Sequence, residues 1–411
     1  MTKQPTTILF VHQNMPGQFR HLAAELAKNP AYRVVFLTLR EGVTMPNIVT
    51  ARYALPEAPP PPAEPLVRSI AQSAHFGSAV AKAAVDMTKK NIVPDLIIAH
   101  PGWGEALFLR DAWPKAKIVT YAEYYYQAYD GDIGFDPLFP RTLQGVCNAR
   151  IMNANLLLSH EAADAMISPT HWQKSRHPQF LQDKTTVIFD GIDTERAAPR
   201  ADASFTLGNG QVLTAKDEVI TYVARNLEPH RGFHVFVEAL PKLLAARPNA
   251  RIIVVGGDER SYSPPPRGGH DSWRSALMNG VDLGQAADRV HFVGKLSYAD
   301  YLSLLQISGA HLYLTYPFVL SWSCLEAMSA GCAIVASDTA PVAEVITHEQ
   351  NGLLVPFFDS SALVASVCRI LDDPALSQKL RQSARQTAIS RYNLADCLKQ
   401  QLAFVNSVLA T

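Results

Sequence analysis

The stretch AHLYLTYPFVLSWSCLEAMSAGCAIVASD (residues 310–338) decides the fold of this chain. It opens with a β-rich apolar run that Pro317 closes, and it ends with another apolar run. Between them Leu325, Met328 and Cys332 recur at helical spacing, so one face of this segment needs a core to pack against. A strand, a helix and a second strand in this order are typical of a parallel sheet that is buried on both faces.

The same alternation of apolar runs and helical segments extends outward over the whole chain. In the second half we expect strands at 218–225, 250–257, 289–294, 310–317 and 332–338. In the first half we expect strands at 6–12, 32–39, 94–100, 116–123, 164–170 and 185–193, and helices near 18–28 and 66–90. The segment 194–211 is polar and irregular. At the end of the chain, helical spacing predicts a terminal helix that carries Leu394, Cys397, Leu398, Leu402 and Val405 on one face.

This pattern predicts an α/β protein with two doubly wound, parallel-sheet (Rossmann-like) domains facing a central cleft. We place the N-terminal domain at 1–193, the C-terminal domain at 194–390 and the terminal helix at 391–411. Two proline-rich segments, 55–66 and 258–273, are expected to be loops. The second is too long for an ordinary connection, which is typical of a functional or disordered segment.

Composition places the chain among soluble globular proteins. It has 411 residues, 48% apolar and 18% charged, and its formal net charge is zero, whereas a nucleic-acid-binding domain is normally basic. No apolar run reaches the ~18 residues that span a bilayer, and the N-terminal apolar run is expected to be a strand rather than a secretion signal. The five cysteines are scattered, odd in number and without metal-ligand spacing, which favours a reducing, cytoplasmic location.

Candidate ligand-binding residues are expected at the carboxyl ends of the strands, where doubly wound sheets bind ligands. Arg225 leaves one strand and Arg231 precedes the next helix, so two guanidinium groups bracket a turn and suit a diphosphate; surface solvation is the alternative. Gly257 ends the following strand and permits close backbone approach. Gly294 and Leu296 flank a turn that would hold a flat base through backbone bonds.

The corner after the strand at 310–317 carries a single acid, Glu326, one turn into the helix. A carboxylate accepts hydrogen bonds bidentately, so Glu326 suits two vicinal hydroxyl groups of a ribose. The alternative is a capping box in which Glu326 bonds back to the backbone of Ser323. Either Ser321 or Ser323 is expected to cap this helix, whose N-terminus is a candidate anion site.

In the first domain the candidates also follow predicted strands. His100 ends a strand close to Trp103, and a structural role is the alternative for this histidine. Glu123 lies between Tyr121 and Tyr124, in a tyrosine-rich segment that suits stacking on, and hydrogen bonding to, a sugar or glycan acceptor. Burial in the core is the alternative for one or two of these tyrosines.

Taken together, these residues resemble the retaining glycosyltransferases of family 4, also called group 1, which have the GT-B fold. The resemblance runs over almost the whole chain, in the motifs NMPGQF, PDLIIAH, ISPTHWQK, VIFDGID, VARNLEPHRGF, IIVVGG, VHFVGKL, SWSCLEAMSAGC, ASDTAPVAEVI and NGLLVPFFD. It implies sugar transfer from a UDP- or GDP-sugar with retention at the anomeric carbon, and no metal ion or other cofactor. It also implies an acceptor-side N-terminal domain, a donor-binding C-terminal domain and a terminal helix that crosses back to the N-terminal domain.

The resemblance implies roles for single residues. Arg225 matches the family's diphosphate-binding arginine, and Arg231 falls where relatives usually carry lysine. Glu326 matches the second glutamate of the family's E-x7-E motif, which holds the donor ribose. Gly17, in a turn before a helix, matches the glycine whose backbone approaches the diphosphate, although no GxGxxG motif surrounds it.

One departure from the family pattern concerns the donor sugar. The first glutamate of E-x7-E contacts the sugar hydroxyl groups in relatives, and that position is Phe318 here. Backbone N–H groups of Val319, Leu320 and Ser321 would then bind the donor instead.

A second departure concerns the His-Asp pair that many relatives carry after the fifth strand. The corresponding residues are Ala122 and Glu123, which leaves Tyr121, Glu123 and His100 as alternative replacements for the histidine.

The expected mechanism is a front-face displacement. The two arginines and the helix N-terminus stabilise the departing diphosphate, whose phosphate takes the acceptor proton, and no side chain acts as nucleophile. Two alternatives remain: a non-catalytic nucleotide-sugar-binding scaffold subunit, and a GT-B nucleotide-sugar epimerase, which would need a carboxylate beside the sugar. Expected partners are the nucleotide-sugar donor and a glycan, lipid-linked glycan, protein or small-molecule acceptor, with no nucleic acid and at most peripheral membrane association.

Overall fold

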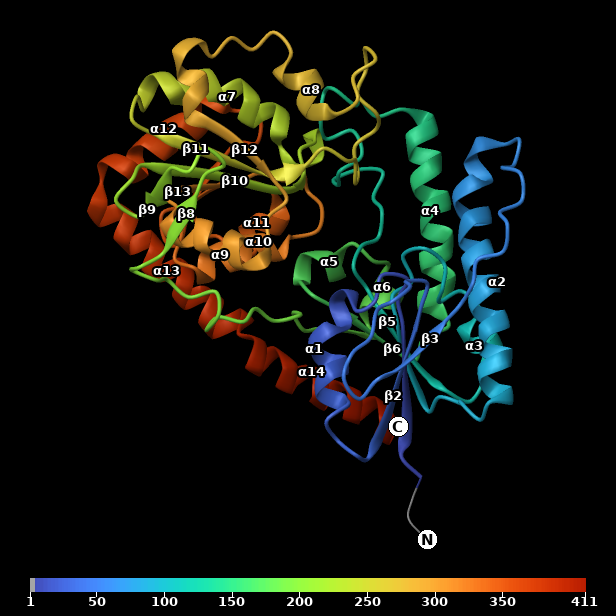
Figure 1. Ribbon diagram of the computed structural model, residues 1–411. Coiled ribbons are helices and arrows are strands. Elements are labelled where there is room, and N and C mark those ends of the chain that lie inside the picture. The colour runs from blue at the N-terminus through green and yellow to red at the C-terminus, as the bar shows by residue number, and fades with distance from the viewer. Residues whose placement is uncertain (1–3) are drawn as a thin grey trace. The chain divides into compact units, whose positions relative to one another are not determined.

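Helices cover both faces of the sheet formed by the first half of the chain (Figure 1). Strand β1 (Thr6–Val11) shows how the apolar runs produce this arrangement. The structure, a computed structural model, describes residues 4–411. Ile8 and Phe10 of β1 belong to one core cluster, whereas Leu9 and Val11 belong to another. Successive side chains of a strand point to opposite faces, and the burial of each side chain of this size stabilises the fold by about 1.5–3 kcal/mol.

The chain divides into two units. Unit 1 comprises the described residues up to Gly191 together with Ala395–Thr411, and unit 2 comprises Ile192–Leu394. Unit 1 contains a seven-stranded parallel sheet in the order β3 (Val49–Arg52), β2 (Tyr32–Thr38), β1, β4 (Leu96–Ala99), β5 (Lys117–Tyr121), β6 (Ala165–Ser168) and β7 (Thr185–Val187). Its helices are α1 (Arg20–Leu26), α2 (Arg68–Lys89), α3 (Leu109–Ala112), α4 (Leu143–Glu161), α5 (His171–Ser175), α6 (Gln179–Gln182) and α14 (Leu394–Ala410), with 3-10 turns η1 (Gly17–Phe19) and η2 (Pro65–Val67).

Different helices cover the two faces of the unit 1 sheet. Buried side chains of α1 and α14 share a core with Ile8 and Phe10, whereas those of α2 and α3 share a core with Leu9 and Val11. Val405 and Val408 are the fully packed residues of α14 in the first of these cores. The last helix of the chain is therefore a structural part of the unit that contains the first strand.

Unit 2 repeats this architecture with a six-stranded parallel sheet. The order is β12 (Val290–Gly294), β11 (Arg251–Gly257), β10 (Val219–Asn226), β13 (Ala310–Tyr313), β14 (Ile334–Ser337) and β15 (Leu353–Val355). Its helices are α7 (Phe233–Ala246), α8 (Trp273–Met278), α9 (Tyr298–Ile307), α10 (Trp322–Ser329), α11 (Ala340–Ala343), α12 (Ser360–Asp372) and α13 (Pro374–Tyr392), with 3-10 turns η3 (Pro229–Arg231) and η4 (Gly284–Arg289).

The segment 194–211, expected to be irregular, contributes to a hairpin. Strands β8 (Ser204–Thr206) and β9 (Val212–Thr214) pair in antiparallel fashion. Phe205 and Leu213 are buried and pack with β10, β11 and α9 in one core cluster. One apolar side chain per three-residue strand suffices for this packing, and so short a pattern is hard to recognise in the sequence.

Candidate active site

Each sheet has one place where the strand order reverses along the chain. In unit 1 it lies between β1 and β4, and in unit 2 it lies between β10 and β13. Ligands of doubly wound sheets bind at such a switch point, outside the carboxyl ends of the strands. The residues at these strand ends are therefore the candidate binding residues of each unit.

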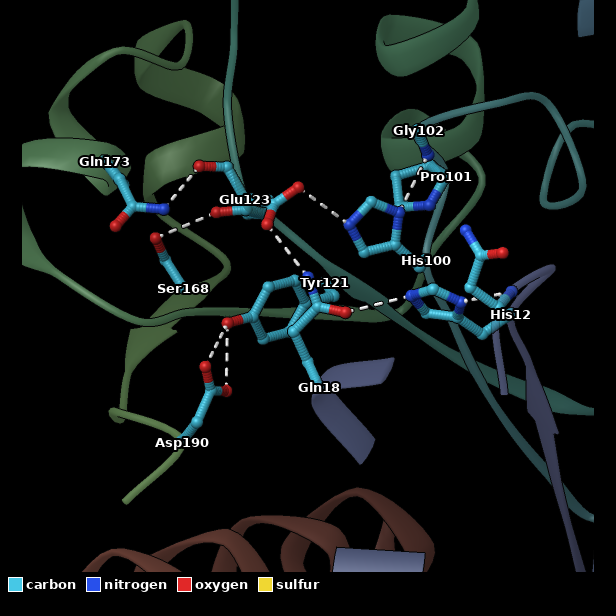
Figure 2. Close-up of polar contacts among 12 residues, drawn as sticks. His12, Gln18, His100, Pro101, Gly102, Tyr121, Glu123, Ser168, Gln173 and Asp190 are labelled. Carbon is cyan, nitrogen blue, oxygen red and sulfur yellow. Dashed lines mark hydrogen bonds and ion pairs between the residues drawn. The ribbon is translucent and has the colours of Figure 1, made fainter. Parts of the chain in front are cut away.

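Glu123 is the centre of a hydrogen-bonded cluster in unit 1 (Figure 2). Its Oε1 accepts a hydrogen bond from Gln18 Nε2 at 2.8 Å, and its Oε2 lies 3.1 Å from His100 Nε2. His100 follows β4, Glu123 follows β5 and Gln18 lies in the turn before α1, so three separate segments supply the cluster. The structure thus brings together His100 and Glu123, both expected from the sequence.

The backbone fixes the tautomer of His100. The N–H group of Gly102 donates to His100 Nδ1 at 3.1 Å, so this nitrogen is an acceptor. The ring proton consequently lies on Nε2 and is donated to the Glu123 carboxylate.

His12 extends the cluster from the end of β1. The N–H group of Asn14 donates to His12 Nδ1 at 2.9 Å, and His12 Nε2 in turn donates to Gln18 Oε1 at 2.9 Å. The Gln18 amide then donates to Glu123. The hydrogen bonds from His12 through Gln18, and from His100, therefore all lead toward the Glu123 carboxylate; Figure 2 shows these contacts.

Burial and neighbouring groups fix the charges of the cluster. Burial, together with the proximity of His100, lowers the pKa of His12 to about 3, so His12 is neutral at pH 7. Burial alone would raise the pKa of Glu123, but the hydrogen bonds from His100 and Gln18 outweigh it and leave the pKa below its ordinary value. The carboxylate is thus charged at neutral pH, and 37% of its side chain remains exposed.

Gly17 allows the cluster to form. It has the left-handed φ of +52°, and a Cβ atom placed on it would lie 2.4 Å from His12 Nε2. Any larger residue would therefore displace the ring that donates to Gln18. Gly17 begins η1, the turn that leads into α1, as expected from the sequence.

The aromatic residues around this cluster differ in their exposure. The ring of Trp103, which is partly exposed, lies 4.9 Å from that of His100 between centroids. Tyr121 and Tyr124 are 4% and 6% exposed, and their hydroxyl groups donate to Asp190 at 2.9 Å and to Asp132 at 2.8 Å. For these two tyrosines, expected on the acceptor side, the structure favours the buried alternative.

A second acid near the cluster, Glu105, is completely buried. Its Oε1 accepts a hydrogen bond from the Tyr53 hydroxyl group at 2.9 Å, and its Oε2 has no partner among the described residues. Burial raises the pKa of Glu105 above its ordinary value, because a charged carboxylate is disfavoured there.

Glu105 should therefore make stability depend on pH. An acid whose pKa is raised on folding stabilises the fold fully below its unfolded pKa, and this contribution is lost as the pH rises through the folded pKa. As the pH rises above the ordinary pKa of glutamate, we expect the Tm of Glu105→Gln to increase relative to that of the unaltered chain. Thermal unfolding at several pH values checks this; parallel Tm curves for the two proteins would contradict it.

Unit 2 contains a pocket of about 400 Å³ at the carboxyl ends of β10, β11 and β12. Binding sites for small molecules commonly measure ~300–1,000 Å³. The pocket is lined by Ala224, Arg225, Val255, Gly256, Lys295, Leu296 and Tyr301. Arg225 and Leu296 were expected from the sequence, and Lys295 lies in the turn between Gly294 and Leu296 that was expected to hold a base; Tyr301 was not expected.

The two arginines of this region have different environments. Arg225 is exposed, and its guanidinium group makes no hydrogen bond or ion pair with the residues that the structure describes. Arg231 is partly buried, and its Nη1 donates to Thr315 Oγ1 at 2.8 Å and to the Val319 carbonyl at 3.3 Å. Arg225 thus leaves its donors available to an anion, whereas Arg231 is held in one orientation.

Gly257 and Gly294 end β11 and β12, as expected. A Cβ atom on Gly257 would lie 2.2 Å from Glu259 Oε2 and 2.5 Å from Lys295 Cε. The glycine makes room for the Lys295–Glu259 ion pair of 2.7 Å, which holds the lysine at the pocket. Gly294 has a φ of +66° at the turn into Lys295.

The corner after β13 is more tightly closed than the sequence suggested. Phe318 and Leu320 are buried, with 6% and 7% of their surfaces exposed. The Ser321 N–H group donates to the Tyr313 hydroxyl group at 2.9 Å. Contrary to the expectation from the sequence, this N–H group is therefore not available to bind the sugar donor. The Val319 carbonyl is likewise engaged, by Arg231.

Glu326 does not form the capping box that was one alternative. The helix is capped by Ser321, whose Oγ accepts from the Ser323 N–H group, so Ser323 already lies within α10. The Glu326 carboxylate accepts hydrogen bonds from the hydroxyl groups of Tyr298 at 2.9 Å and Tyr301 at 3.1 Å. Because Tyr301 lines the pocket, Glu326 lies immediately behind its wall.

Residues 4–411 contain neither a metal-ligand cluster nor a membrane-spanning helix. No group of three or more His, Cys, Asp or Glu side chains in this range is arranged to hold a metal ion. None of the helices in the same range is both long and apolar enough to cross a membrane.

Two family models match the chain, one in each half. Residues 30–197 match the model described as glycosyl transferase family 4 group, and residues 209–387 match glycosyl transferases group 1. Among curated proteins, glycogen synthase of Mycobacterium tuberculosis is 28% identical over 208 residues, which cover 51% of this chain and 45% of that protein. Phosphatidyl-myo-inositol mannosyltransferase of Mycolicibacterium smegmatis is 30% identical over 224 residues, covering 53% and 50%. The chain thus spans about half the length of these relatives.

Solved structures resemble the chain over nearly its whole length. Sucrose-phosphate synthase from Thermosynechococcus elongatus has a TM-score of 0.74 at 20% identity, with 98% of this chain and 99% of that chain covered. Alr3699/HepE from Anabaena, in complex with UDP-glucose, has a TM-score of 0.67 at 16% identity, with 98% and 99% covered. At these identities the likeness shows a shared fold.

Proposed function

Because this chain belongs to the group 1 glycosyltransferases of family 4, we propose that it transfers a sugar from a nucleotide-diphosphate sugar to a hydroxyl group of an acceptor. Its fold is GT-B, an α/β architecture with two parallel-sheet, Rossmann-like domains. The observation that carries the proposed activity is the unit 2 pocket, where Arg225 and Lys295 supply positive charge. A carboxylate suited to a ribose, that of Glu326, lies behind the same pocket.

In this proposal unit 2 binds the donor. Arg225 pairs with the diphosphate through charge-assisted hydrogen bonds, and Arg231, already oriented by Thr315, adds a second positive charge. Glu326, which is only partly buried and contacts the pocket-lining Tyr301, accepts hydrogen bonds from the ribose hydroxyl groups, since a carboxylate can accept bidentately. The base packs beside Leu296. A UDP- or GDP-sugar fits this scheme, and the complex of a structural neighbour with UDP-glucose supports a nucleotide-sugar donor.

The proposed reaction retains the anomeric configuration and needs no metal ion. The bond between the anomeric carbon and the diphosphate oxygen breaks, and the bond to the acceptor oxygen forms on the same face of the sugar. The acceptor proton passes to the departing phosphate oxygen. Arg225 and Arg231 stabilise the negative charge that develops on the diphosphate, and fixed charges of this kind are often the largest contribution to catalysis.

Unit 1 supplies the acceptor side in this proposal. The Glu123 carboxylate is charged, partly exposed and held by His100 and Gln18, so it can accept a hydrogen bond from an acceptor hydroxyl group and orient it. The partly exposed ring of Trp103 beside His100 offers an aromatic surface for a sugar ring.

A thermal-shift screen of UDP- and GDP-sugars tests donor binding. A ligand that binds only the folded state at 100 times its Kd stabilises by about 2.7 kcal/mol, and in domains of this size that raises Tm by roughly 5–10 °C. We expect at least one nucleotide sugar to do so, and Glu326→Gln to reduce the shift. If no nucleotide sugar or nucleoside diphosphate raises Tm, the donor assignment is wrong. An enzyme would also cleave the bound nucleotide sugar and release a nucleoside diphosphate, whereas a scaffold subunit would bind the nucleotide sugar without cleaving it.

A further inference from the structure

The segment 258–273, which the sequence predicts to be a long loop, is anchored close to where it leaves β11. The carboxylate of Glu228, a residue only 1% exposed, accepts hydrogen bonds from three successive backbone N–H groups, those of Ser261 (3.2 Å), Tyr262 (3.2 Å) and Ser263 (3.0 Å). Successive N–H groups that converge in this way form an anion-binding concavity, and here the anion is a side chain of the same chain. Burial of a carboxylate is costly unless such donors surround it.

Additional contacts hold the same turn. The Ser263 Oγ accepts from the His230 N–H group at 3.1 Å, and the Asn226 side chain lies 2.7 Å from Ser261 Oγ. Both contacts come from the segment between Arg225 and Arg231, which connects the two arginines. The turn 261–263 is therefore fixed to the segment that carries the proposed diphosphate-binding charges.

The anchored turn places Tyr262 beside Arg231. The Arg231 guanidinium lies 5.5 Å from the centre of the Tyr262 ring and 5.9 Å from that of Phe318, and the two rings lie 4.9 Å apart. His230 completes this aromatic group, at 5.1 Å from Tyr262. Phe318 is buried but Tyr262 is 44% exposed, so Tyr262 is the member of the group that a ligand can reach.

We propose that the turn 261–263 is part of the donor site, with Tyr262 as a sugar-contacting specificity residue and Glu228 as the positioning residue that holds it there. An aromatic ring contacts the C–H face of a sugar, and the neighbouring guanidinium binds the diphosphate to which that sugar is attached. Glu228 acts through the backbone of the turn and does not touch the donor. This inference rests on the proposed glycosyltransferase function.

The experiment measures KM and kcat with UDP-glucose and GDP-mannose, and the affinity for UDP and GDP alone. Tyr262→Ala should raise KM for the nucleotide sugar that is used by about tenfold or more, while the affinity for its nucleoside diphosphate changes less than twofold. Tyr262→Phe keeps the ring and should resemble the unaltered chain. Glu228→Gln leaves fewer oxygen atoms to accept hydrogen bonds from the N–H groups of the turn 261–263. It should therefore raise KM for the same nucleotide sugar, as Tyr262→Ala does.

Glu218→Gln is the matched control. Glu218 is a partly buried acid of unit 2 that pairs with Arg247 and has no contact with the pocket lining. Glu218→Gln should lower Tm without changing KM for the nucleotide sugar. If the unaltered chain binds neither nucleotide sugars nor UDP or GDP, the proposed function itself fails.

If the unaltered chain is active but Tyr262→Ala leaves KM within twofold, the inference is overturned. The inference is also overturned if Tyr262→Ala weakens the binding of UDP or GDP as much as it weakens the binding of the nucleotide sugar. Because Tyr262 is an exposed loop residue, Tyr262→Ala should fold normally. Its KM therefore tests the inference even if Glu228→Gln fails to fold.

Discussion

Replacement of Arg225 and Arg231 together by alanine should reduce sugar transfer by about 10²–10⁴-fold while the chain still folds. Each charge-assisted hydrogen bond to the diphosphate contributes about 1.5–3 kcal/mol, and every 1.4 kcal/mol corresponds to a tenfold change in rate. Steady-state kinetics with the donor identified by thermal shift, together with circular dichroism of the variant, provide the measurement.

The two positions differ in their expected cost to stability. Arg225 is exposed and its guanidinium group makes no hydrogen bond or ion pair with the described residues, so its removal should leave Tm almost unchanged. Arg231 donates to Thr315 and Val319, and its removal leaves these acceptors unpaired. Arg200→Ala is a suitable control, because Arg200 is an exposed residue of the same unit that pairs with Asp202 at the surface. Near-normal turnover of the double variant would exclude the proposed stabilisation of the leaving group.

Glu123→Gln should lower kcat/KM for the acceptor by about 5–100-fold and leave donor binding intact. Both oxygens of Glu123 accept hydrogen bonds, from His100 and from Gln18. A glutamine of the same size presents an N–H group to one of these two donors, and an unpaired buried donor costs about 1–3 kcal/mol. Acceptor-dependent kinetics measure the first effect, and the thermal shift with nucleotide sugar measures the second.

The same variant should change the acid sensitivity of the fold. The pKa of Glu123 lies below its ordinary value, so its contribution to stability is present above the unfolded pKa and is lost as the pH falls through the folded pKa. Glu123→Gln should therefore lose less stability than the unaltered chain between neutral and strongly acidic pH. Glu161→Gln, at the exposed end of α4, is the matched control. A loss of donor binding in Glu123→Gln would contradict its assignment to the acceptor side.

The sequence predicts most of the two sheets because their central strands are continuous apolar runs, such as Ile8–Val11 and Ile252–Val255. It does not predict β3 or β15, which are short strands at the sheet edges. An edge strand has one neighbour and can form with few apolar residues, so its pattern resembles that of a loop.

The sequence predicted the positions of several candidate site residues, but it did not predict which residues they contact. His100, Glu123 and Arg225 could be identified because each lies at or just beyond the carboxyl end of a strand. Their partners could not, since Gln18 lies 105 residues from Glu123 in the chain and the tyrosines that bind Glu326 lie on another helix. Nothing in local spacing indicates such contacts, and the same is true of the anchored turn at Glu228.

The one-way direction of the hydrogen bonds around Glu123 bears on the proposed binding of an acceptor there. Gln18 has its oxygen toward His12 and its amide nitrogen toward Glu123, so a half-turn of its amide would place like groups against each other at both ends. A flip of the His100 ring would put carbon atoms in the places of Nε2 and Nδ1, and both the bond to Glu123 and the bond from Gly102 would be lost. Each side chain thus has a single permitted orientation before any ligand arrives. The entropy of ordering these groups is lost when the chain folds, and an acceptor that meets them loses little more on binding.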